Sequence, residues 1–88
     1  MLSKIGVVYM KLSEAVSQRV NELLVEKDKT QYELYKLSGV SQSTISDIRL
    51  MKNNSVNLRI IYEITQGLNM DLFDFFNSPL FKGNNIID

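Results

Sequence analysis

Apolar residues recur along the chain at spacings of three and four positions, the period of an amphipathic helix. From residue 13 the first stripe predicts a helix of about four turns, and shorter stripes follow it. Phe73, Phe75 and Phe76 cannot all point inward from one short helix, so we expect some exposed aromatic surface there. The pattern predicts an all-α fold. The core is expected to comprise Val16, Val20, Leu23, Leu24, Leu34, Leu37, Ile45, Ile48, Leu58, Ile61, Ile64 and Leu68.

Two short helices joined by a glycine turn are predicted between residues 30 and 48, in the sequence TQYELYKLSGVSQSTISDI. Thr30 is a good N-cap, and Glu33 completes a capping box that satisfies backbone donors at the start of the first of these helices. Gly39 tolerates the left-handed conformation in which helices commonly end. Ser41 can then cap the second helix. This arrangement is typical of a helix-turn-helix, which presents its second, recognition helix to DNA.

The segment resembles the Cro and phage-repressor type of helix-turn-helix, also called the XRE family, in which T-Q-x-x-L followed by S-G-V-S-Q-S-T-I-S is a familiar run. Further on, NLRIIYEITQGLNMDLFDFF looks like the fourth and fifth helices of that family. The resemblance implies a five-helix, repressor-like domain over residues 11–77. Residues 1–10 would form an N-terminal extension and residues 78–88 a C-terminal tail.

With 88 residues and neither cysteine nor histidine, the chain is expected to form one domain with few options for chemistry. The usual zinc ligands and the usual general base near neutral pH are missing. We therefore expect no enzymatic activity, no metal and no cofactor. The first nine residues, MLSKIGVVY, are too short to span a bilayer and carry no small-residue cleavage site. We therefore expect a cytoplasmic protein without a membrane role.

Charge is unevenly distributed, although ten basic residues balance ten acidic ones. From Lys27 to Arg59 six basic residues stand against three acidic ones, which gives this region a net charge of plus three. Beyond Arg59 four acidic residues are accompanied only by Lys82. The positive potential therefore surrounds the predicted helix-turn-helix, which favours an interaction with DNA phosphates.

The first residues of the recognition helix are the candidates for base contacts, because such a helix reads bases through its N-terminal half. Gln42 can donate to and accept from an adenine edge at once, and Ser43 can bond a base edge or a phosphate. Thr44 offers a hydroxyl and a methyl that can pack on thymine, while Asp47 can accept from cytosine. The alternative role of Gln42 is a solvated helix residue, and that of Asp47 is pairing within the protein.

Residues around both helices are candidates for contacts with the DNA backbone. Gln31 lies in a first helical turn, where free N–H groups and the helix dipole favour a phosphate, and the matching glutamine holds the DNA backbone in similar proteins. The loop after the recognition helix supplies one charge and two amide donors. For any single lysine the alternative is a solvated surface position. The set comprises Gln31, Ser41, Lys36, Arg49, Lys52, Asn53 and Asn54, and within this region Lys36 and the additional Arg59 are the weaker candidates.

Three features depart from the usual pattern of the family. Tyr35 stands where a small residue is usual, so its ring must swing out or push the two helices apart. Met51 stands near the usual helix-ending glycine, so the recognition helix is expected to run longer. The usual ion pair between the first helix and the end of the recognition helix is replaced by Leu24 and Arg49. We therefore expect Arg49 to be released toward solvent or phosphate.

Both ends of the chain leave alternatives open. Residues 5–10 are apolar and rich in β-branched side chains, which predicts either a strand that pairs with a second copy or a flexible extension. The flexible extension is favoured. The final residues, GNNIID, indicate a loose or partner-dependent tail.

The sequence as a whole predicts a sequence-specific transcriptional regulator, a repressor, that binds double-stranded DNA. It would act as a homodimer and read the major groove with the helix at residues 41–50. A different class of function is the alternative, namely a protein-interaction module such as an antitoxin-like partner of another protein. The neutral net charge favours this alternative.

Overall fold

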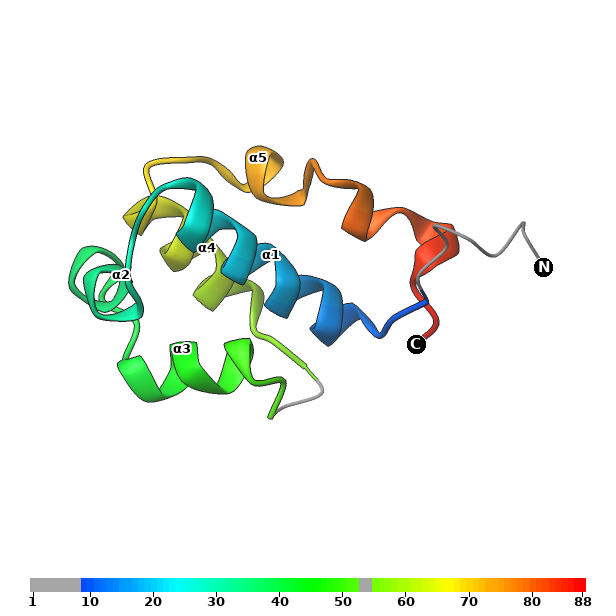
Figure 1. Ribbon diagram of the computed structural model, residues 1–88, viewed down its shortest axis with the longest axis horizontal. Coiled ribbons are helices and arrows are strands. Elements are labelled where there is room, and N and C mark those ends of the chain that lie inside the picture. The colour runs from blue at the N-terminus through cyan, green and yellow to red at the C-terminus, as the bar shows by residue number, and fades with distance from the viewer. Residues whose placement is uncertain (1–8, 53–54) are drawn as a thin grey trace.

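The computed structural model describes residues 9–52 and 55–88 of the chain. Its helices are α1 (Leu12–Glu26), α2 (Gln31–Ser38), α3 (Gln42–Arg49), α4 (Leu58–Gly67) and α5 (Leu72–Phe76), then the short 3-10 helices η2 (Pro79–Phe81) and η3 (Gly83–Asn85). Helix α1 runs through the centre of the molecule, with α3 on one side and α5 on the opposite side (Figure 1). The predicted five-helix, all-α class is confirmed for the described residues. None of these helices combines the length and the apolar character that a membrane span requires.

The core is formed where the inward faces of the first four helices meet, and a phenylalanine of α5 closes it. Phe75 is fully buried, whereas Phe73 is 74% exposed, which confirms that the helix leaves aromatic surface outside. Burial of the apolar faces supplies most of the stability of such a small domain. The core residues are Val16, Val20, Leu23, Leu24, Leu34, Val40, Ile45, Ile48, Ile61, Ile64, Leu68 and Phe75.

Two predicted core residues lie outside the core instead. Leu37 is 54% exposed because Ser38, the next residue, is the one that faces α4. A Cβ atom at Gly67 would lie 2.8 Å from the Cβ of Ser38, so only glycine allows this close approach of α2 and α4. Leu58 is 62% exposed because the first turn of α4 borders an open apolar recess, which Phe76 also lines.

The helix ends follow local chemistry that was readable in the sequence. Thr30 and Glu33 form the predicted capping box, and the left-handed Gly39 (φ 79°) ends α2. The side chains of Ser41, Asn57 and Asp71 cap the three helices that follow. These side chains satisfy N–H groups that would otherwise lack acceptors within the helix.

The end of α3 differs from the prediction of a longer recognition helix. Met51 takes the left-handed conformation itself, with φ 57°, and the helix ends at Arg49. The Met51 N–H donates to the Ile48 carbonyl at 3.2 Å, and the Lys52 N–H donates to the Asp47 carbonyl at 2.9 Å. This is the Schellman pattern, in which two backbone bonds close the helix even though the residue is not glycine. The prediction was wrong because these bonds offset the strain of the methionine.

The last residues of the chain pair with the segment before α1. Met10 forms an isolated parallel β-bridge with Ile86, in which its N–H donates to the Asn85 carbonyl and its carbonyl accepts from Ile87, each at 2.9 Å. The Leu12 N–H donates to a carboxylate oxygen of Asp88 at 2.7 Å. The interpretation of GNNIID as a loose tail is therefore wrong. A strand or a flexible extension was expected at residues 5–10. Of these, only residues 9 and 10 belong to the described part of the chain.

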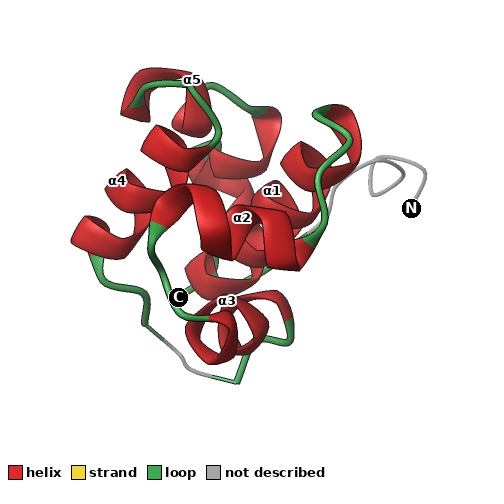
Figure 2. Cartoon of the chain, turned by 90° about the vertical axis from the view of Figure 1, so that its left-hand side faces the viewer, coloured by secondary structure: helices red, strands yellow, loops and turns green. Residues whose placement is uncertain are grey.

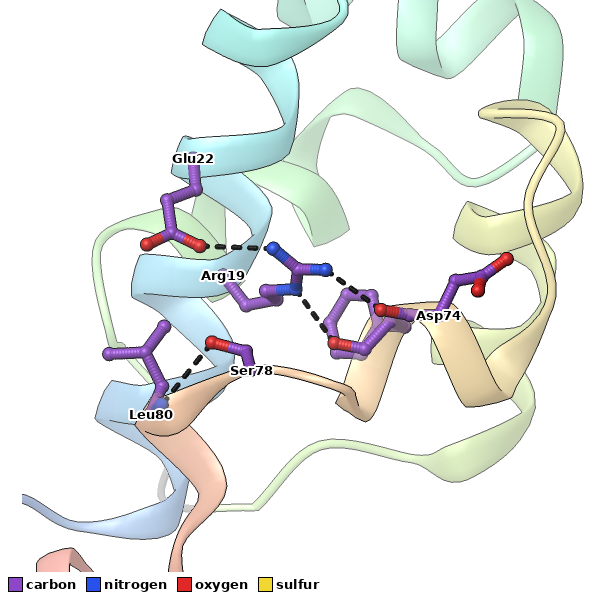
Figure 3. Close-up of polar contacts among 6 residues, drawn as sticks. Arg19, Glu22, Asp74, Ser78 and Leu80 are labelled. Atoms are coloured by element: carbon purple, nitrogen blue, oxygen red, sulfur yellow. Dashed lines mark hydrogen bonds and ion pairs between the residues drawn. The ribbon is translucent and has the colours of Figure 1, made fainter.

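Arg19 joins α1 to α5, as Figure 3 shows. Its Nε donates to the carbonyl of Phe75 at 2.7 Å, and its Nη2 donates to the carbonyl of Asp74 at 2.8 Å. Its Nη1 lies 3.1 Å from a carboxylate oxygen of Glu22, one turn along α1. Only 13% of the Arg19 side chain is exposed. The guanidinium thus donates to carbonyls near the end of α5. These carbonyls lack N–H donors from within the helix because no further turn follows them.

Candidate nucleic-acid interface

Helices α2 and α3 lie together at one end of the molecule, with α3 along its lower edge in both views (Figure 2). Ile45 and Ile48 anchor α3 in the core, so the opposite face of this helix is turned outward. Gln42 and Ser43 are exposed, and Asp47 is half-buried. The two apolar anchors therefore fix α3 on the domain while its N-terminal residues remain accessible.

The start of α3 carries a cluster of three hydroxyl groups. The Ser41 Oγ accepts from the Thr44 N–H at 3.2 Å and lies 3.0 Å from the Thr44 Oγ1, to which it donates. It also lies 3.3 Å from the Ser43 Oγ. Ser41 and Thr44 are thus partly engaged within the helix, whereas the side-chain amide of Gln42 makes no hydrogen bond to the described residues. Gln42 is the polar side chain of this end most available to a ligand.

The carboxylate of Asp47 has no cation within ion-pair distance among the described residues. The alternative role of Asp47, an ion pair within the protein, is therefore not seen among the described residues. Its backbone carbonyl takes part in the closure of α3 described above. An unpaired carboxylate beside a phosphate backbone lowers affinity unless it accepts a hydrogen bond from a base.

Arg49 is held, rather than released as predicted. Its Nε donates to the Asn21 Oδ1 at 2.6 Å, and its Nη1 donates to the Gln31 Oε1 at 3.1 Å. The Ser17 hydroxyl donates to the Arg49 carbonyl at 2.9 Å. The expectation of a free side chain was wrong because amide oxygens accept from a guanidinium as carboxylates do. Arg49 therefore connects the end of α3 to α1 and to the start of α2.

Sequence reasoning did not single out Asn21 or Ser17. They stand four residues apart on α1, a spacing that places both on one face of the helix. Ser17 is buried and Asn21 half-buried, between the apolar residues of the core stripe. Their spacing, beside the apolar stripe of α1, is the sequence feature that could have predicted a polar contact with another helix.

Three of the remaining candidates for contacts with the DNA backbone are described, namely Lys36 on α2, Lys52 after α3 and Arg59 on α4. Lys36 is exposed, with its Nζ 5.9 Å from the centre of the Tyr32 ring. The Tyr35 ring packs against Tyr32 with centroids 5.8 Å apart, so it has swung out, as one of the two predicted outcomes required. Lys52 is exposed. Asn53 and Asn54 lie outside the described residues, and Arg59 pairs with Glu63 at 3.3 Å.

The capping box at the start of α2 joins Glu33 to Thr30 through two hydrogen bonds and lowers the pKa of the Glu33 carboxylate. The Thr30 N–H donates to the Glu33 Oε1 at 2.9 Å, and the Glu33 N–H donates to the Thr30 Oγ1 at 3.0 Å. The hydrogen bond from the Thr30 backbone lowers the pKa of Glu33, and the Thr30 hydroxyl and the charge of Lys29 act in the same direction. This carboxylate therefore stays ionised at the first turn of α2, beside Gln31.

The family model described as the Cro/C1-type helix-turn-helix DNA-binding domain matches residues 19–78. Among solved structures, the wild-type restriction-modification controller protein C.Esp1396I is similar, with 26% identity, a TM-score of 0.68 and coverage of 74% of this chain and 84% of that chain. A point mutant of the same controller protein has 25% identity, a TM-score of 0.70 and coverage of 78% and 86%. A comparison with curated proteins gave no match.

Proposed function

Because the chain belongs to the Cro/C1-type helix-turn-helix DNA-binding domain family, we propose that this protein is a sequence-specific transcriptional repressor that reads the major groove with α3. The observation that carries the proposal is the exposure of Gln42 and Ser43 at the start of a helix anchored by Ile45 and Ile48. A recognition helix needs this combination of accessible polar residues and a rigid apolar attachment. The similarity to a controller protein supports a regulatory role.

In this proposal each of four residues of α3 makes one contact with a base. Gln42 forms the bidentate contact with adenine, which contributes roughly 1 to 3 kcal/mol of discrimination. Ser43 bonds a neighbouring base edge, and the Thr44 methyl packs on a thymine methyl. Asp47, unpaired among the described residues, accepts from a cytosine amino group.

Backbone contacts come from residues on both sides of α3. Gln31 and Lys36 belong to α2, Ser41 caps α3 and Arg49 ends it. Lys52, Asn53 and Asn54 follow α3 in the sequence. If one subunit neutralises about four phosphates, log affinity falls against log salt with a slope of about −3.6 per subunit. A dimer would show about twice that slope.

The protein acts as a homodimer in this proposal, because a two-fold symmetric operator presents two half-sites to one assembly. The exposed Phe73, Phe76 and Leu58 support an apolar contact between subunits through α5 and the start of α4. Paired α3 helices would lie about 34 Å apart, one turn of DNA. Sedimentation of the Phe73→Ser variant should show monomers where the original protein shows dimers.

Selection of randomised duplex DNA at near-physiological salt, followed by sequencing of the retained molecules, tests the proposal. The expected result is enrichment of an inverted repeat with half-sites one helical turn apart. No enrichment by folded protein would contradict it. That outcome would favour the protein-interaction module, for which the exposed Phe73 is the supporting observation.

A further inference from the structure

The side chains of three residues, one within α1, one at the end of α3 and one at the start of α2, are linked by hydrogen bonds. The Arg49 Nε donates to the Asn21 Oδ1 at 2.6 Å, and the Arg49 Nη1 donates to the Gln31 Oε1 at 3.1 Å. The Gln31 Nε2 in turn points to the Gln42 carbonyl, 3.5 Å away. These hydrogen bonds therefore lead from the half-buried Asn21 on α1 to the exposed start of α3.

A guanidinium can only donate hydrogen bonds, so it fixes which end of each amide faces it. The Gln31 oxygen must face Arg49, and the Gln31 nitrogen is thereby turned toward α3. That nitrogen carries two hydrogens, and the long contact with the Gln42 carbonyl engages one of them at most. One donor of Gln31 is left for an oxygen outside the protein.

The same hydrogen bonds leave the charge of Arg49 unneutralised. Both of its acceptors are neutral amides, and no carboxylate lies within ion-pair distance among the described residues. The Ser17 hydroxyl holds the Arg49 backbone at 2.9 Å. A cation fixed in this way makes the electrostatic potential at the start of α2 more positive, because no internal carboxylate neutralises its charge.

We infer that Asn21 and Arg49 form a positioning pair that orients the side-chain amide of Gln31 toward a DNA phosphate. The inference rests on the proposed function and adds Asn21, a residue of α1, to the DNA-binding machinery. Asn21 acts through Arg49 and touches no DNA itself. A preoriented amide loses less rotamer freedom on binding than a mobile one, so the pair raises affinity for any duplex.

A double-mutant cycle between Asn21→Leu and Gln31→Ala tests this inference. The probe is a fluorescein-labelled duplex of mixed sequence at low salt, because phosphate contacts are independent of sequence. Asn21→Leu alone should weaken binding about fivefold to tenfold, the loss expected for one charge-assisted hydrogen bond. In the Gln31→Ala background it should weaken binding by less than about twofold, because the amide that it orients is gone. Gln18→Leu, an exposed substitution on the same helix, is the matched control and should leave affinity unchanged.

A second variant separates positioning from charge. Arg49→Lys keeps the charge but cannot hold both amides in the planar fork of a guanidinium. It should weaken binding about as much as Asn21→Leu while the slope of log affinity against log salt stays at the value of the unchanged protein. Because this variant keeps a cation, it also serves if Asn21→Leu does not fold, as judged by circular dichroism.

The outcomes are distinct. An equal loss from Asn21→Leu with and without Gln31 would overturn the inference, since Asn21 would then contact DNA directly. Full affinity in Arg49→Lys would overturn it as well, because charge alone would suffice. Failure of the unchanged protein to bind the duplex would overturn the proposed function, and this is seen before any variant is measured.

Discussion

Two arginine side chains hold the two sides of α1 in different ways. Arg19 reaches two backbone carbonyls of α5 and the carboxylate of Glu22. Arg49 instead bonds the neutral amides of Asn21 and Gln31. The charge of Arg19 is therefore committed to closing the α5 side, whereas Arg49 keeps its charge on the side where α2 and α3 meet.

This contrast fits the proposed function, in which one side of the domain supplies stability and the other side binds DNA. On the α5 side an aromatic cluster forms around the buried Phe75, whose ring lies 5.0 Å from Phe76 and 6.0 Å from Phe81. On the α3 side the chain keeps the exposed Gln42 and the strained Met51. A surface that must bind another molecule keeps donors and charges unpaired, and stability has to come from elsewhere in the fold.

The largest expected effect is on the α5 side. Arg19→Leu should lower the free energy of unfolding by about 2 to 3 kcal/mol, because two carbonyls lose charged donors. Urea denaturation measures the change. Glu22→Gln keeps those two bonds and removes only the exposed ion pair, so it should cost less than about 1 kcal/mol. Equal losses in the two variants would show that the ion pair, and not the carbonyl contact, holds α5.

A smaller loss of stability is expected on the α3 side. Arg49→Met should lower the free energy of unfolding by only about 1 kcal/mol, because its acceptors are half-buried side-chain amides, which can turn toward water in a way that backbone carbonyls cannot. The same variant should weaken DNA binding and reduce the salt slope by about 0.9, the contribution of one phosphate. Urea denaturation and fluorescence anisotropy measure the two effects. A stability loss as large as that of Arg19→Leu would remove the contrast between the two arginines.

The strain at the end of α3 should be measurable by substitution. Met51→Asn should raise the free energy of unfolding by about 0.5 to 1 kcal/mol, since asparagine tolerates the left-handed region better. Asn69 follows α4 with the same φ of 57°, so the reverse substitution at this position is a control. Asn69→Met should lower stability by a similar amount. A thermal unfolding shift of the same sign in both variants would contradict this account of Met51.

The smallest effect concerns pH at the start of α2. The pKa of Glu33 is lowered from 4.5, chiefly by the hydrogen bond from the Thr30 backbone. A lowered pKa in the folded state adds stability above pH 4.5 that is lost as the pH falls through the folded value. The stability difference between the original protein and Glu33→Gln should therefore shrink below pH 4.5. Urea denaturation across this range measures it, and a constant difference would contradict the assignment.

Local chemistry allowed much of the fold to be predicted from the sequence. The caps at Thr30 and Ser41 were predicted because each depends on a residue three positions away, so the spacing carries the information. The left-handed conformation of Asn69 is also a local matter, since asparagine tolerates this region better than most residues do. The exposed start of α3 followed from the apolar positions that anchor it.

Contacts between distant residues could not be predicted in this way. Arg19 bonds residues more than fifty positions away, and no pattern in the sequence indicates which carbonyls it reaches. Arg49 was expected to be free because both members of the family's usual ion pair are missing, but the amide oxygens of Asn21 and Gln31 accept from it instead. The pairing of Met10 with Ile86 likewise joins the two ends of the domain. Contact with DNA by the named residues stays a prediction.

Base reading by the N-terminal residues of α3 can be tested at Gln42. The most direct test compares the DNA motifs selected from one randomised pool by the original protein and by Gln42→Ala. The variant should lose its preference at one symmetric pair of positions, where the original protein selects adenine, and should keep the remaining motif. An identical motif recovered at lower affinity would contradict base reading by Gln42 and assign it to the DNA backbone.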